Sequence, residues 1–408
     1  MIKKTCSIRA LVFRRGHIAV IGASRAQIQW WSRVSLNLHH IRRRGFLLAC
    51  VPLLSCARRR ASGFEGYAFV ANEEGRSVAV VDLTAFAVKR HVALESPPTA
   101  VIAHPSRPAV YVLTPPAGTV HEIDAVSLSL KRKARAAATA HLMRLTPQGD
   151  ALWMLCREQR TLARMGVERM EISVRVRLAA QPEDLDISRE GHVAVSLPAL
   201  DAVALLRDGR VEHTVKVGAD PRALRFRSDG RQVLVGNRGD RTVSVVDVAR
   251  GKIVAHLPLA VEPENFCFKP DGGVLFVTGK GLDAVAAIYP YRTLVAETLL
   301  AGRSPAAMAA CSGPSDYLFV ANPPSGDVTI LDINTSKVAA VVAAGAEPGY
   351  ITITPDNQYA LVLNRRSGDM AVIRIAALRD KRSRPAPPPL FTMIRVGAKP
   401  VCAAVRAV

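Results

Sequence analysis

Acidic residues are missing from the first sixty positions, and aromatic residues are scarce throughout. Residues 1–60 hold 13 of the 55 Lys and Arg and no Asp or Glu, so the net charge of +21 leaves +8 for residues 61–408. In that later part basic residues alternate with acids, as at Arg238, Asp240 and Arg241. Nucleic-acid binding needs a basic stripe with stacking aromatics, but aromatics make up only 5% of the chain. We therefore predict no nucleic-acid partner.

Motifs of several catalytic and metal-binding classes are also missing. The sequence has no Gly-x-Ser-x-Gly elbow, no phosphate-binding loop and no Cys-x-x-Cys-His. His104 and His141 are the least implausible metal ligands, but core or surface roles suit them better. We therefore predict no metal site and no cofactor. The later cysteines fit no zinc site, and free buried thiols are favoured over the disulfide that export permits, at Cys156, Cys267, Cys311 and Cys402.

No apolar run near the N-terminus is long enough to cross a bilayer as a helix, which takes about twenty residues. Basic Arg42–Arg44 instead precede a short apolar run, Phe46–Leu54. A basic region, a short apolar run and small residues before a cysteine are typical of a signal peptide. Residues 1–60 are thus predicted to be an export segment, and 61–408 a single domain.

Two resemblances refine this segment. Arg43-Arg44-Gly45-Phe46-Leu47 resembles a twin-arginine export motif, and Leu53-Leu54-Ser55-Cys56 resembles a bacterial lipobox. The lipobox implies that Cys56 is lipidated and anchors the protein to a membrane of the periplasm or cell envelope. The alternative is an ordinary secretory signal with a chance cysteine. The long stretch before the motif favours a start downstream of Met1, near Val34 or Leu36.

From residue 67 a unit of roughly 42 residues recurs. A short apolar strand returns at starts 40 to 43 residues apart, aligned to positions 68, 110, 152, 193, 233, 275, 318 and 360. A second strand follows and ends in an acid at Asp82, Asp124, Asp247 and Asp332. A third strand comes next, and a proline opens the fourth, at Pro98, Pro182, Pro221, Pro263, Pro305, Pro348 and Pro400, with His141 in the remaining unit. Four short strands with turns between them indicate one blade of a β-propeller.

The repeat resembles the YVTN family of β-propeller repeats. The matching features are the strand that ends in Asn72, Asn237, Asn322 or Asn364, the TVSVVD run at 242–247, and the Pro-Asp-Gly turns. The resemblance covers about residues 66–408 and weakens at 156–212 and 283–300. It implies an all-β propeller, in which the units where the resemblance weakens are expected to form blades that are distorted or that have diverged for function.

The phase of the repeat predicts how the ring closes. Residues 67–94 supply the three outer strands of one blade, and Pro400–Val405 supplies its innermost strand. Pairing the two ends removes open sheet edges. We expect eight blades, or seven if a weak unit forms none, in a monomer. A Pro/Arg-rich insertion, Arg379–Pro389, is expected to form a loop.

Two sets of loops are expected on one face of the ring. One set leads into the innermost strands, and the other follows the first strand of each repeat unit. That face surrounds the channel mouth and is the default ligand site. Its main candidates are Glu73, Arg76, Arg157, Glu183, Arg238, Asp240, Glu264, Arg303, Glu347 and Arg365, with Glu74, Glu158, Asp184, Glu262, Lys280 and Arg366 beside them. The recurring aspartates are expected to accept turn N–H groups as scaffold residues.

The favoured function is therefore an exported binding or scaffold module that takes an unknown protein or small molecule. No catalytic residue can be assigned, so an enzyme is less favoured. The alternative rests on fold analogy alone, because propellers of the YVTN type are similar to lactonase propellers and to haem d1 domains of nitrite reductases.

Overall fold

A computed structural model describes residues 11–14, 17–20, 63–313, 316–378 and 388–408. The chain divides into two units, Met1–Ala61 and Ser62–Val408. In the first unit β1 (Leu11–Arg14) pairs with β2 (His17–Val20). Arg43, Arg44 and Cys56 lie outside the described residues. No helix among the described residues is long and apolar enough to cross a membrane.

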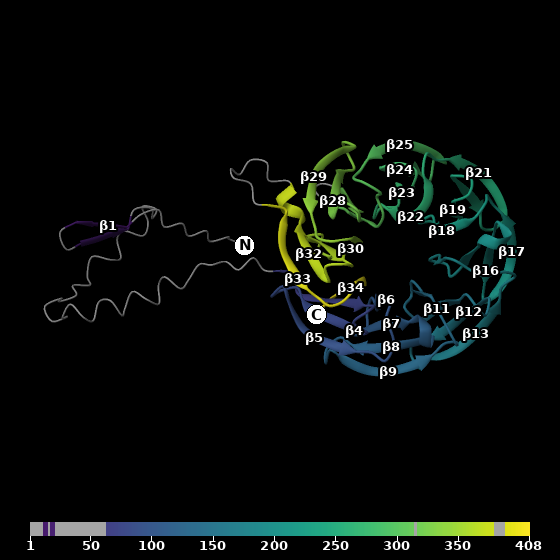
Figure 1. The fold of residues 1–408 in the computed structure, drawn as a ribbon, viewed down its shortest axis with the longest axis horizontal. Helices are drawn as coiled ribbons and strands as arrows, with labels where there is room; N and C mark the ends of the chain where they lie inside the picture. The colour runs from purple at the N-terminus through teal and green to yellow at the C-terminus, as the bar shows by residue number, and fades with distance from the viewer. Residues whose placement is uncertain (1–10, 15–16, 21–62, 314–315, 379–387) are drawn as a thin grey trace, which may run out of the picture. The chain divides into compact units, whose positions relative to one another are not determined.

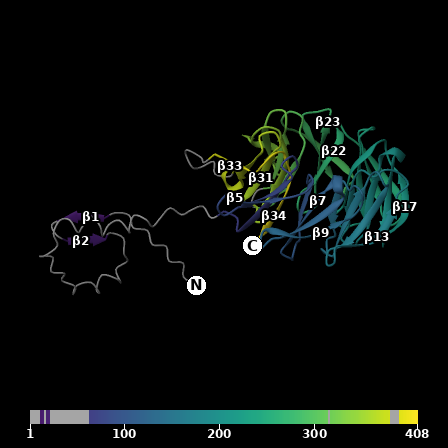
Figure 2. The same ribbon diagram turned by 60° about the horizontal axis from the view of Figure 1, so that its bottom comes forward.

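The described part of the second unit forms eight four-stranded antiparallel sheets, arranged as the blades of a propeller (Figures 1 and 2). The eight-blade prediction is confirmed. Blade 1 contains β34 (Pro400–Ala407), β3 (Gly66–Asn72), β4 (Ser77–Asp82) and β5 (Ala87–Ala93); blade 2 contains β6 (Ala100–Ala103), β7 (Ala109–Thr114), β8 (Thr119–Asp124) and β9 (Ser129–Arg135); blade 3 contains β10 (Leu142–Leu145), β11 (Ala151–Cys156), β12 (Thr161–Gly166) and β13 (Glu171–Arg177); blade 4 contains β14 (Leu185–Ile187), β15 (Val193–Leu197), β16 (Ala202–Arg207) and β17 (Arg210–Lys216).

The other four blades repeat this order from the innermost to the outermost strand. Blade 5 contains β18 (Pro221–Phe226), β19 (Gln232–Asn237), β20 (Thr242–Asp247) and β21 (Lys252–Pro258); blade 6 contains β22 (Glu262–Phe268), β23 (Leu275–Lys280), β24 (Ala284–Tyr289) and β25 (Leu294–Leu300); blade 7 contains β26 (Met308–Cys311), β27 (Tyr317–Asn322), β28 (Asp327–Asp332) and β29 (Lys337–Ala343); blade 8 contains β30 (Pro348–Ile353), β31 (Tyr359–Asn364), β32 (Asp369–Arg374) and β33 (Leu390–Arg395). Single 3-10 turns lie at η2 (Pro115–Ala117), η3 (Pro198–Leu200) and η4 (Ile375–Leu378).

The ring closes in blade 1, as the sequence predicts. Strand β34 pairs with β3 in a register that runs from Gly66 opposite Ala407 to Asn72 opposite Pro400. Figure 1 shows the yellow C-terminal strand beside the blue-purple strands from the start of the domain. Part of the predicted insertion, residues 379–387, lies outside the described residues.

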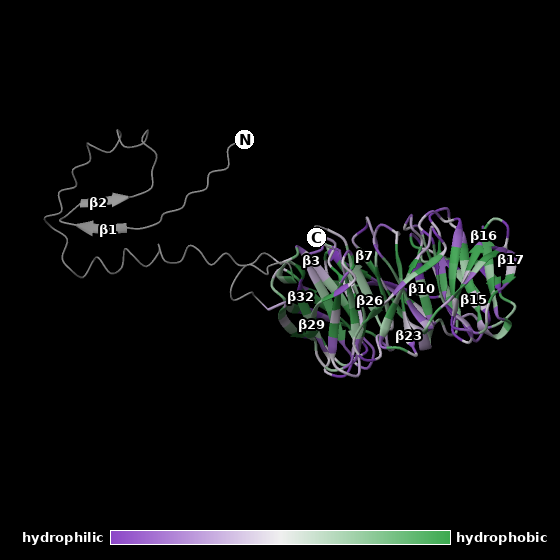
Figure 3. Ribbon diagram, turned by 90° about the horizontal axis from the view of Figure 1, so that it is seen from above, coloured by the Kyte–Doolittle hydropathy of each residue, from purple (hydrophilic) through white to green (hydrophobic). Residues whose placement is uncertain are grey.

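Burial follows the position of a strand within its blade. The second strands are buried almost along their whole length, as in β7, β11 and β31, because neighbouring blades cover both faces. The outermost strands alternate, as in β21, where only Leu257 is buried. Every blade has the same irregularity in register between its third and fourth strands. A bulge of this kind increases the local twist. The loops between the strands are largely hydrophilic and lie at the two rims of the ring, as Figure 3 shows.

The recurring aspartates are scaffold residues, as predicted. Asp82 Oδ1 accepts the main-chain N–H groups of Thr84 and Ala85 at 2.8 and 3.1 Å. Asp124, Asp247 and Asp332 accept the equivalent turn N–H groups. The carboxylate thus fixes the turn between the third and fourth strands.

A second recurring pair joins the end of the second strand to the loop before the innermost strand. Each YVTN-like asparagine is fully buried and lies against a glycine three residues before the blade's proline. A Cβ built on Gly345 would lie 2.4 Å from Asn364 Nδ2, and Gly345 has φ +141°. The same contact recurs at Asn72 with Gly397, Asn237 with Gly218, and Asn322 with Gly302.

The four blades without the asparagine also lack the glycine. The asparagine position holds Thr114, Cys156, Leu197 and Gly279, and the glycine position holds Glu95, Ala138, Ala179 and Ala260. The asparagine and the glycine therefore occur together in a repeat or are both absent. This indicates a steric requirement, because the asparagine amide occupies the space that a Cβ at the glycine position would take.

Replacing Gly345 by Ala should therefore destabilise the propeller by about 2 kcal/mol or more, because a left-handed conformation is strained for alanine and its Cβ displaces Asn364. Chemical denaturation measures this loss. Ala260→Gly, at the same loop position in blade 6, is the matched control and should cost at most about 1 kcal/mol. Equal effects of the two substitutions would contradict the proposed packing.

Candidate functional site

The central channel contains a cavity of about 410 Å³. Six of the eight innermost strands or the loops that enter them contribute to it, together with one loop of blade 3. Its lining is His141, Leu142, Arg157, Glu183, Asp184, Arg222, Ala223, Arg225, Glu264, Asn265, Phe266, Ala307, Met308, Gly349, Tyr350 and Ile351. The volume is within the range of small-molecule sites, roughly 300–1,000 Å³.

The two walls of this cavity differ in chemistry. All three arginines of the lining come from blades 3 to 5. The wall from blades 6 to 8 carries one charged residue, Glu264, and is otherwise made of small, apolar and aromatic residues with one amide. A molecule in the channel would therefore contact cations and carboxylates on one side and mainly apolar groups on the other.

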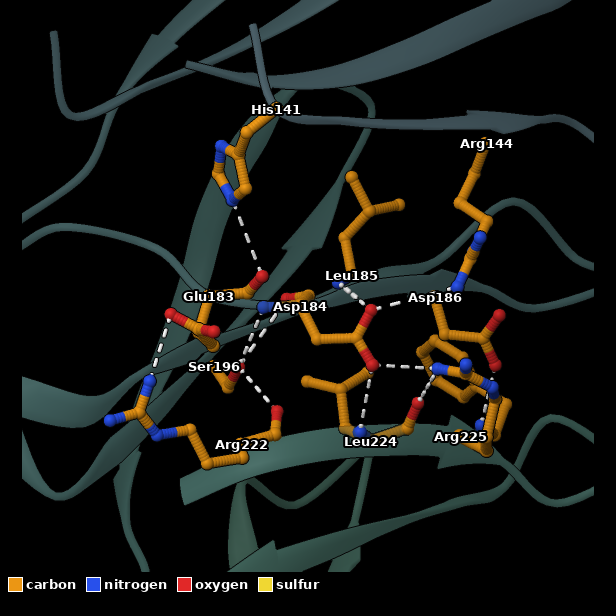
Figure 4. A network of polar contacts seen from close by, with 11 residues as sticks. His141, Arg144, Glu183, Asp184, Leu185, Asp186, Ser196, Arg222, Leu224 and Arg225 are labelled. Atoms are coloured by element: carbon orange, nitrogen blue, oxygen red, sulfur yellow. Dashed lines mark hydrogen bonds and ion pairs between the residues drawn. The ribbon is translucent and has the colours of Figure 1, made fainter. Parts of the chain in front are cut away.

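Asp184 is the centre of the charged wall (Figure 4). Its Oδ2 accepts a hydrogen bond from Arg225 Nη1 at 2.7 Å, and its Oδ1 lies 3.7 Å from Arg144 Nη2. The side chain of Asp184 is 15% exposed, whereas those of Arg225 and Arg144 are 27% and 34% exposed. One carboxylate is thus shared by two guanidinium groups that still have donors to offer.

Asp184 and Asp186 also join blade 4 to blade 5. The innermost strand of a blade has one edge without a partner strand, which leaves main-chain N–H groups to be satisfied. Asp184 Oδ2 accepts the Leu224 N–H at 3.2 Å, and Asp186 Oδ2 accepts the Phe226 N–H at 2.8 Å. The Asp-x-Asp spacing matches the two-residue period of β18, so the carboxylates act like a short partner strand.

Ion pairs continue from the cavity to the mouth of the channel. Arg157 Nη2 lies 2.5 Å from Glu183 Oε2, and Arg222 Nη1 lies 3.1 Å from the same oxygen. Arg222 Nε lies 2.8 Å from Asp220 Oδ1, and Arg238 Nε lies 2.7 Å from Asp220 Oδ2. These residues form a chain of alternating charge across the entrances to blades 4 and 5.

The charged groups are strongly affected by their surroundings. Burial raises the pKa of Asp186 above its usual value, although Arg225 and Arg144 oppose this. Burial works against the Arg225 cation, but Asp184 and Asp186 outweigh it and raise the pKa of Arg225. Burial, followed by repulsion from Arg225, lowers the pKa of Arg144. Of these three groups only Arg225 lines the cavity, and Arg144 and Asp186 act on it from beside the lining.

His141 and Ser196 do not form a catalytic pair. His141 Nε2 lies 3.4 Å from the Glu183 carbonyl oxygen, and burial followed by Arg157 lowers the pKa of His141. The Ser196 hydroxyl donates to the Arg222 carbonyl at 2.8 Å and accepts the Asp184 N–H. Both side chains are therefore held by the main chain, and neither activates the other.

A tyrosine and two thiols lie along the inner strands of blades 1, 6 and 8. The Tyr350 hydroxyl donates to the Ala403 carbonyl at 3.1 Å. The Cys402 thiol, followed by burial, raises the pKa of Tyr350 well above its usual value. Burial raises the pKa of Cys402, and raises that of Cys267 to about 11. These thiols are protonated near neutral pH, which makes them poor nucleophiles and metal ligands.

The ten predicted site residues separate into three groups. Arg157, Glu183 and Glu264 line the channel cavity. Glu347 and Arg365 line a second hollow of about 500 Å³. The others are surface residues: Arg76 and Arg303 are exposed, Arg238 pairs with Asp220, Asp240 Oδ2 accepts the Ala219 N–H, and Glu73 pairs with Lys399.

The sequence analysis missed Arg144, Asp186, Arg222 and Arg225. These residues lie within or at the start of inner strands, where the repeat leads one to expect buried apolar residues. The signal was present, because charges interrupt the inner strands of blades 3, 4 and 5 (LMRL, LDI and PRALRF). Blades 3 and 4 retain complete four-stranded sheets, so the weak repeat at 156–212 reflects different side chains on an undistorted fold.

The other candidates are structural. His104 is buried; its Nε2 lies 2.9 Å from the Gly149 carbonyl oxygen, and its Nδ1 accepts the N–H of Arg107 at 2.9 Å. Cys156, Cys267 and Cys402 have free thiols, and Cys311 is buried on β26. Within the described ranges no group of three or more His, Cys, Asp and Glu could hold a metal ion.

Comparisons with known proteins support the propeller fold. No protein-family model matches the chain, so the resemblance to YVTN repeats stays a prediction. A segment of 150 residues is 25% identical to the seven-bladed beta-propeller protein Rv1057 of Mycobacterium tuberculosis. The match covers 36% of this chain and 38% of that protein. The eight blades described above differ from the seven in that protein's name.

Three solved structures share the fold. Dihydro-heme d1 dehydrogenase NirN in complex with DHE superposes with a TM-score of 0.71 at 15% identity, over 86% of this chain and 78% of that chain. Kuenenia stuttgartiensis hydrazine synthase gives 0.55 at 19% identity, over 68% and 96%. A functionally unknown protein from Desulfotomaculum acetoxidans gives 0.58 at 9% identity, over 83% and 98%. At these identities the likeness concerns the fold alone.

Replacing Asp184 by Asn should destabilise the propeller by about 2–3 kcal/mol, because it leaves partly buried guanidinium groups without their carboxylate. The cost is expected to be lower than for a fully buried ion pair, since the channel leaves the partners of Asp184 partly exposed. Urea denaturation measures the change. Asp150→Asn is the control, since Asp150 is 55% exposed in its ion pair with Arg164 and such pairs contribute about 0–1 kcal/mol. Equal losses in both variants would show that Asp184 has no special role.

Asp186 should make stability fall as the pH rises above 3.8, the ordinary value of its pKa. Its folded pKa is raised, so the native state binds the proton more tightly and loses this advantage as the pH passes through the folded pKa. Asp186→Asn should flatten the decline in free energy of unfolding between acidic and neutral pH. Asp124→Asn should have the opposite effect on the pH profile and lower the free energy of unfolding more at neutral than at acidic pH. The reason is that turn hydrogen bonds from Ser127 and then Val126 lower the pKa of Asp124 and outweigh the effect of burial. The same profile in both variants would refute the assignment.

Proposed function

We propose that this chain is an exported, lipid-anchored binding protein whose channel holds a small amphipathic molecule. The observation that carries the proposal is the two-walled cavity: arginines and carboxylates on blades 3 to 5 face apolar and aromatic side chains on blades 6 to 8. A molecule with an apolar body and a charged or strongly polar end satisfies both walls, since few directional polar contacts on an apolar lining are typical of ligand sites.

Binding is favoured over catalysis by the condition of the polar groups. The arginines and acids are already paired with one another, and Ser196 and His141 are held by main-chain groups. Such a preorganised wall orients a ligand without supplying an activated nucleophile. The similar propeller protein NirN was solved in complex with DHE, which supports small-molecule binding as a role that this fold accommodates.

The proposed location at the cell envelope depends on the segment before the propeller. Arg43 and Arg44 resemble an export motif, and Cys56 follows a lipobox-like sequence. A lipid on Cys56 would hold the propeller at a membrane of the cell envelope, where one acyl signal alone gives weak attachment and two or more give stable attachment.

The channel site is tested with 8-anilinonaphthalene-1-sulfonate, an amphipathic anion whose fluorescence rises in apolar surroundings. The probe should bind the full chain carrying Cys56→Ser saturably at one site. Ala307→Phe, which fills the apolar wall, should weaken binding at least about tenfold by excluding the probe, at a typical cost of 1–3 kcal/mol for overpacking. Arg250→Ala is the control, because Arg250 is 80% exposed and lies outside the channel lining. Unchanged binding in Ala307→Phe would refute the channel site.

The anchor is tested by fractionating cells that express the full chain. Cys56→Ser should move the protein from the membrane fraction to the soluble envelope fraction, because the acyl chains that hold it would be lost. Cys50→Ser, in the same segment, should leave the protein in the membrane fraction. Membrane retention of Cys56→Ser would contradict the lipobox prediction and leave the channel site unaffected.

A further inference from the structure

A second hollow lies where blade 8 meets blade 1, which is also where the ring closes. We call it the seam hollow. It has a volume of about 500 Å³ and is formed by the loops after β3, β31 and β33 and the loop before β30. Its lining is Glu74, Glu347, Arg365, Arg366, Ser367, Gly368, Arg395, Gly397, Ala398 and Lys399.

Cations outnumber anions in this hollow by four to two. Three of the cations, Arg365, Arg366 and Arg395, make no side-chain hydrogen bond or ion pair with any described residue. Only Lys399 is paired, at 3.1 Å from Glu73 Oε2 and 3.9 Å from Glu74 Oε1. Three exposed arginines thus line one hollow, and their side chains have no partner among the described residues.

In blade 5 the equivalent two loops are joined by an ion pair. Arg238 follows Asn237 just as Arg365 follows Asn364, and Asp220 precedes Pro221 just as Glu347 precedes Pro348. In blade 5 the arginine and the acid form an ion pair of 2.7 Å. In blade 8 the equivalent Arg365 and Glu347 form no ion pair with each other. The arginine that is closed by an acid in blade 5 is therefore left unpaired in the seam hollow.

The position of Arg365 depends on a glycine of the channel. A Cβ built on Gly349 would lie 2.4 Å from Arg365 Nε, so the guanidinium lies directly over the main chain at Gly349. Gly349 also lines the channel cavity. The seam hollow therefore adjoins the channel site at this residue.

We propose that the seam hollow binds a phosphate monoester group, carried by a soluble ester or by a lipid headgroup. Guanidinium groups match phosphate oxygens in pairs of parallel hydrogen bonds. A phosphate monoester near neutral pH carries close to two negative charges, which equals the excess of cations over carboxylates in the hollow, whereas one carboxylate or a phosphodiester would leave a cation unpaired. The inference does not depend on the channel ligand.

The test is calorimetric titration of the full chain carrying Cys56→Ser with glycerol 3-phosphate. Arg365→Ala should weaken binding at least about tenfold, because a charge-assisted hydrogen bond to phosphate contributes about 1.5–3 kcal/mol. Arg303→Ala removes one exposed positive charge outside the seam hollow and should leave the affinity unchanged. Gly349→Ala should also weaken binding, by displacing Arg365. Thermal unfolding of each variant shows whether the fold is intact.

Vesicles of phosphatidylcholine with and without phosphatidic acid, whose headgroup is a phosphate monoester, distinguish the two sources. Binding to the anionic vesicles that glycerol 3-phosphate displaces, and that Arg365→Ala reduces, supports a headgroup. Binding of the soluble ester alone supports a soluble ligand. The proposal is overturned if the ester does not bind, or if Arg365→Ala and Arg303→Ala weaken binding equally, as general charge attraction would. Neither result bears on the 8-anilinonaphthalene-1-sulfonate titration.

Discussion

The pairing of β34 with β3 holds the propeller together. The second and third strands of each blade are buried because a neighbouring blade covers each face, so a blade without two neighbours exposes a largely apolar sheet. Only a closed ring gives every blade two neighbours. Strand β34 completes both the innermost position of blade 1 and the ring.

Closure also creates the feature on which a binding role depends. Eight inner strands present one unpaired edge each to the channel, and these edges must be satisfied by side chains, water or ligand. Between blades 4 and 5 the carboxylates of Asp184 and Asp186 do this for Leu224 and Phe226. Arg144 and Arg225 balance the buried charge, and together these residues make one side of the channel polar. The opposite side is mainly apolar and aromatic.

Much of the fold could be predicted from the sequence because the repeat places the same residue at the same structural position eight times. The prolines, the asparagines and the strand-end aspartates gave the blades, their order and the closing strand. The Gly-x-x-Pro loop recurs visibly in four of the repeats, whereas the register shift between the third and fourth strands of every blade appears only in the folded sheets. The channel was predicted in part. Arg157 and Glu183 lie in loops with visible charge, and Glu264 lies near the start of its inner strand β22. Arg144, Asp186 and Arg225 lie in strands whose orientation only the packed ring defines.

The two ends of the propeller lie within one hydrogen bond of each other, since the Val408 N–H donates to the Glu65 carbonyl at 3.3 Å. Seven blades are each made from one continuous stretch of chain, and only blade 1 combines both ends. A ring of this kind has no intrinsic first blade. A circularly permuted chain, with the present ends joined and new ends in another loop between blades, would have the same contacts. The order of the blades around the channel would be unchanged by such a permutation.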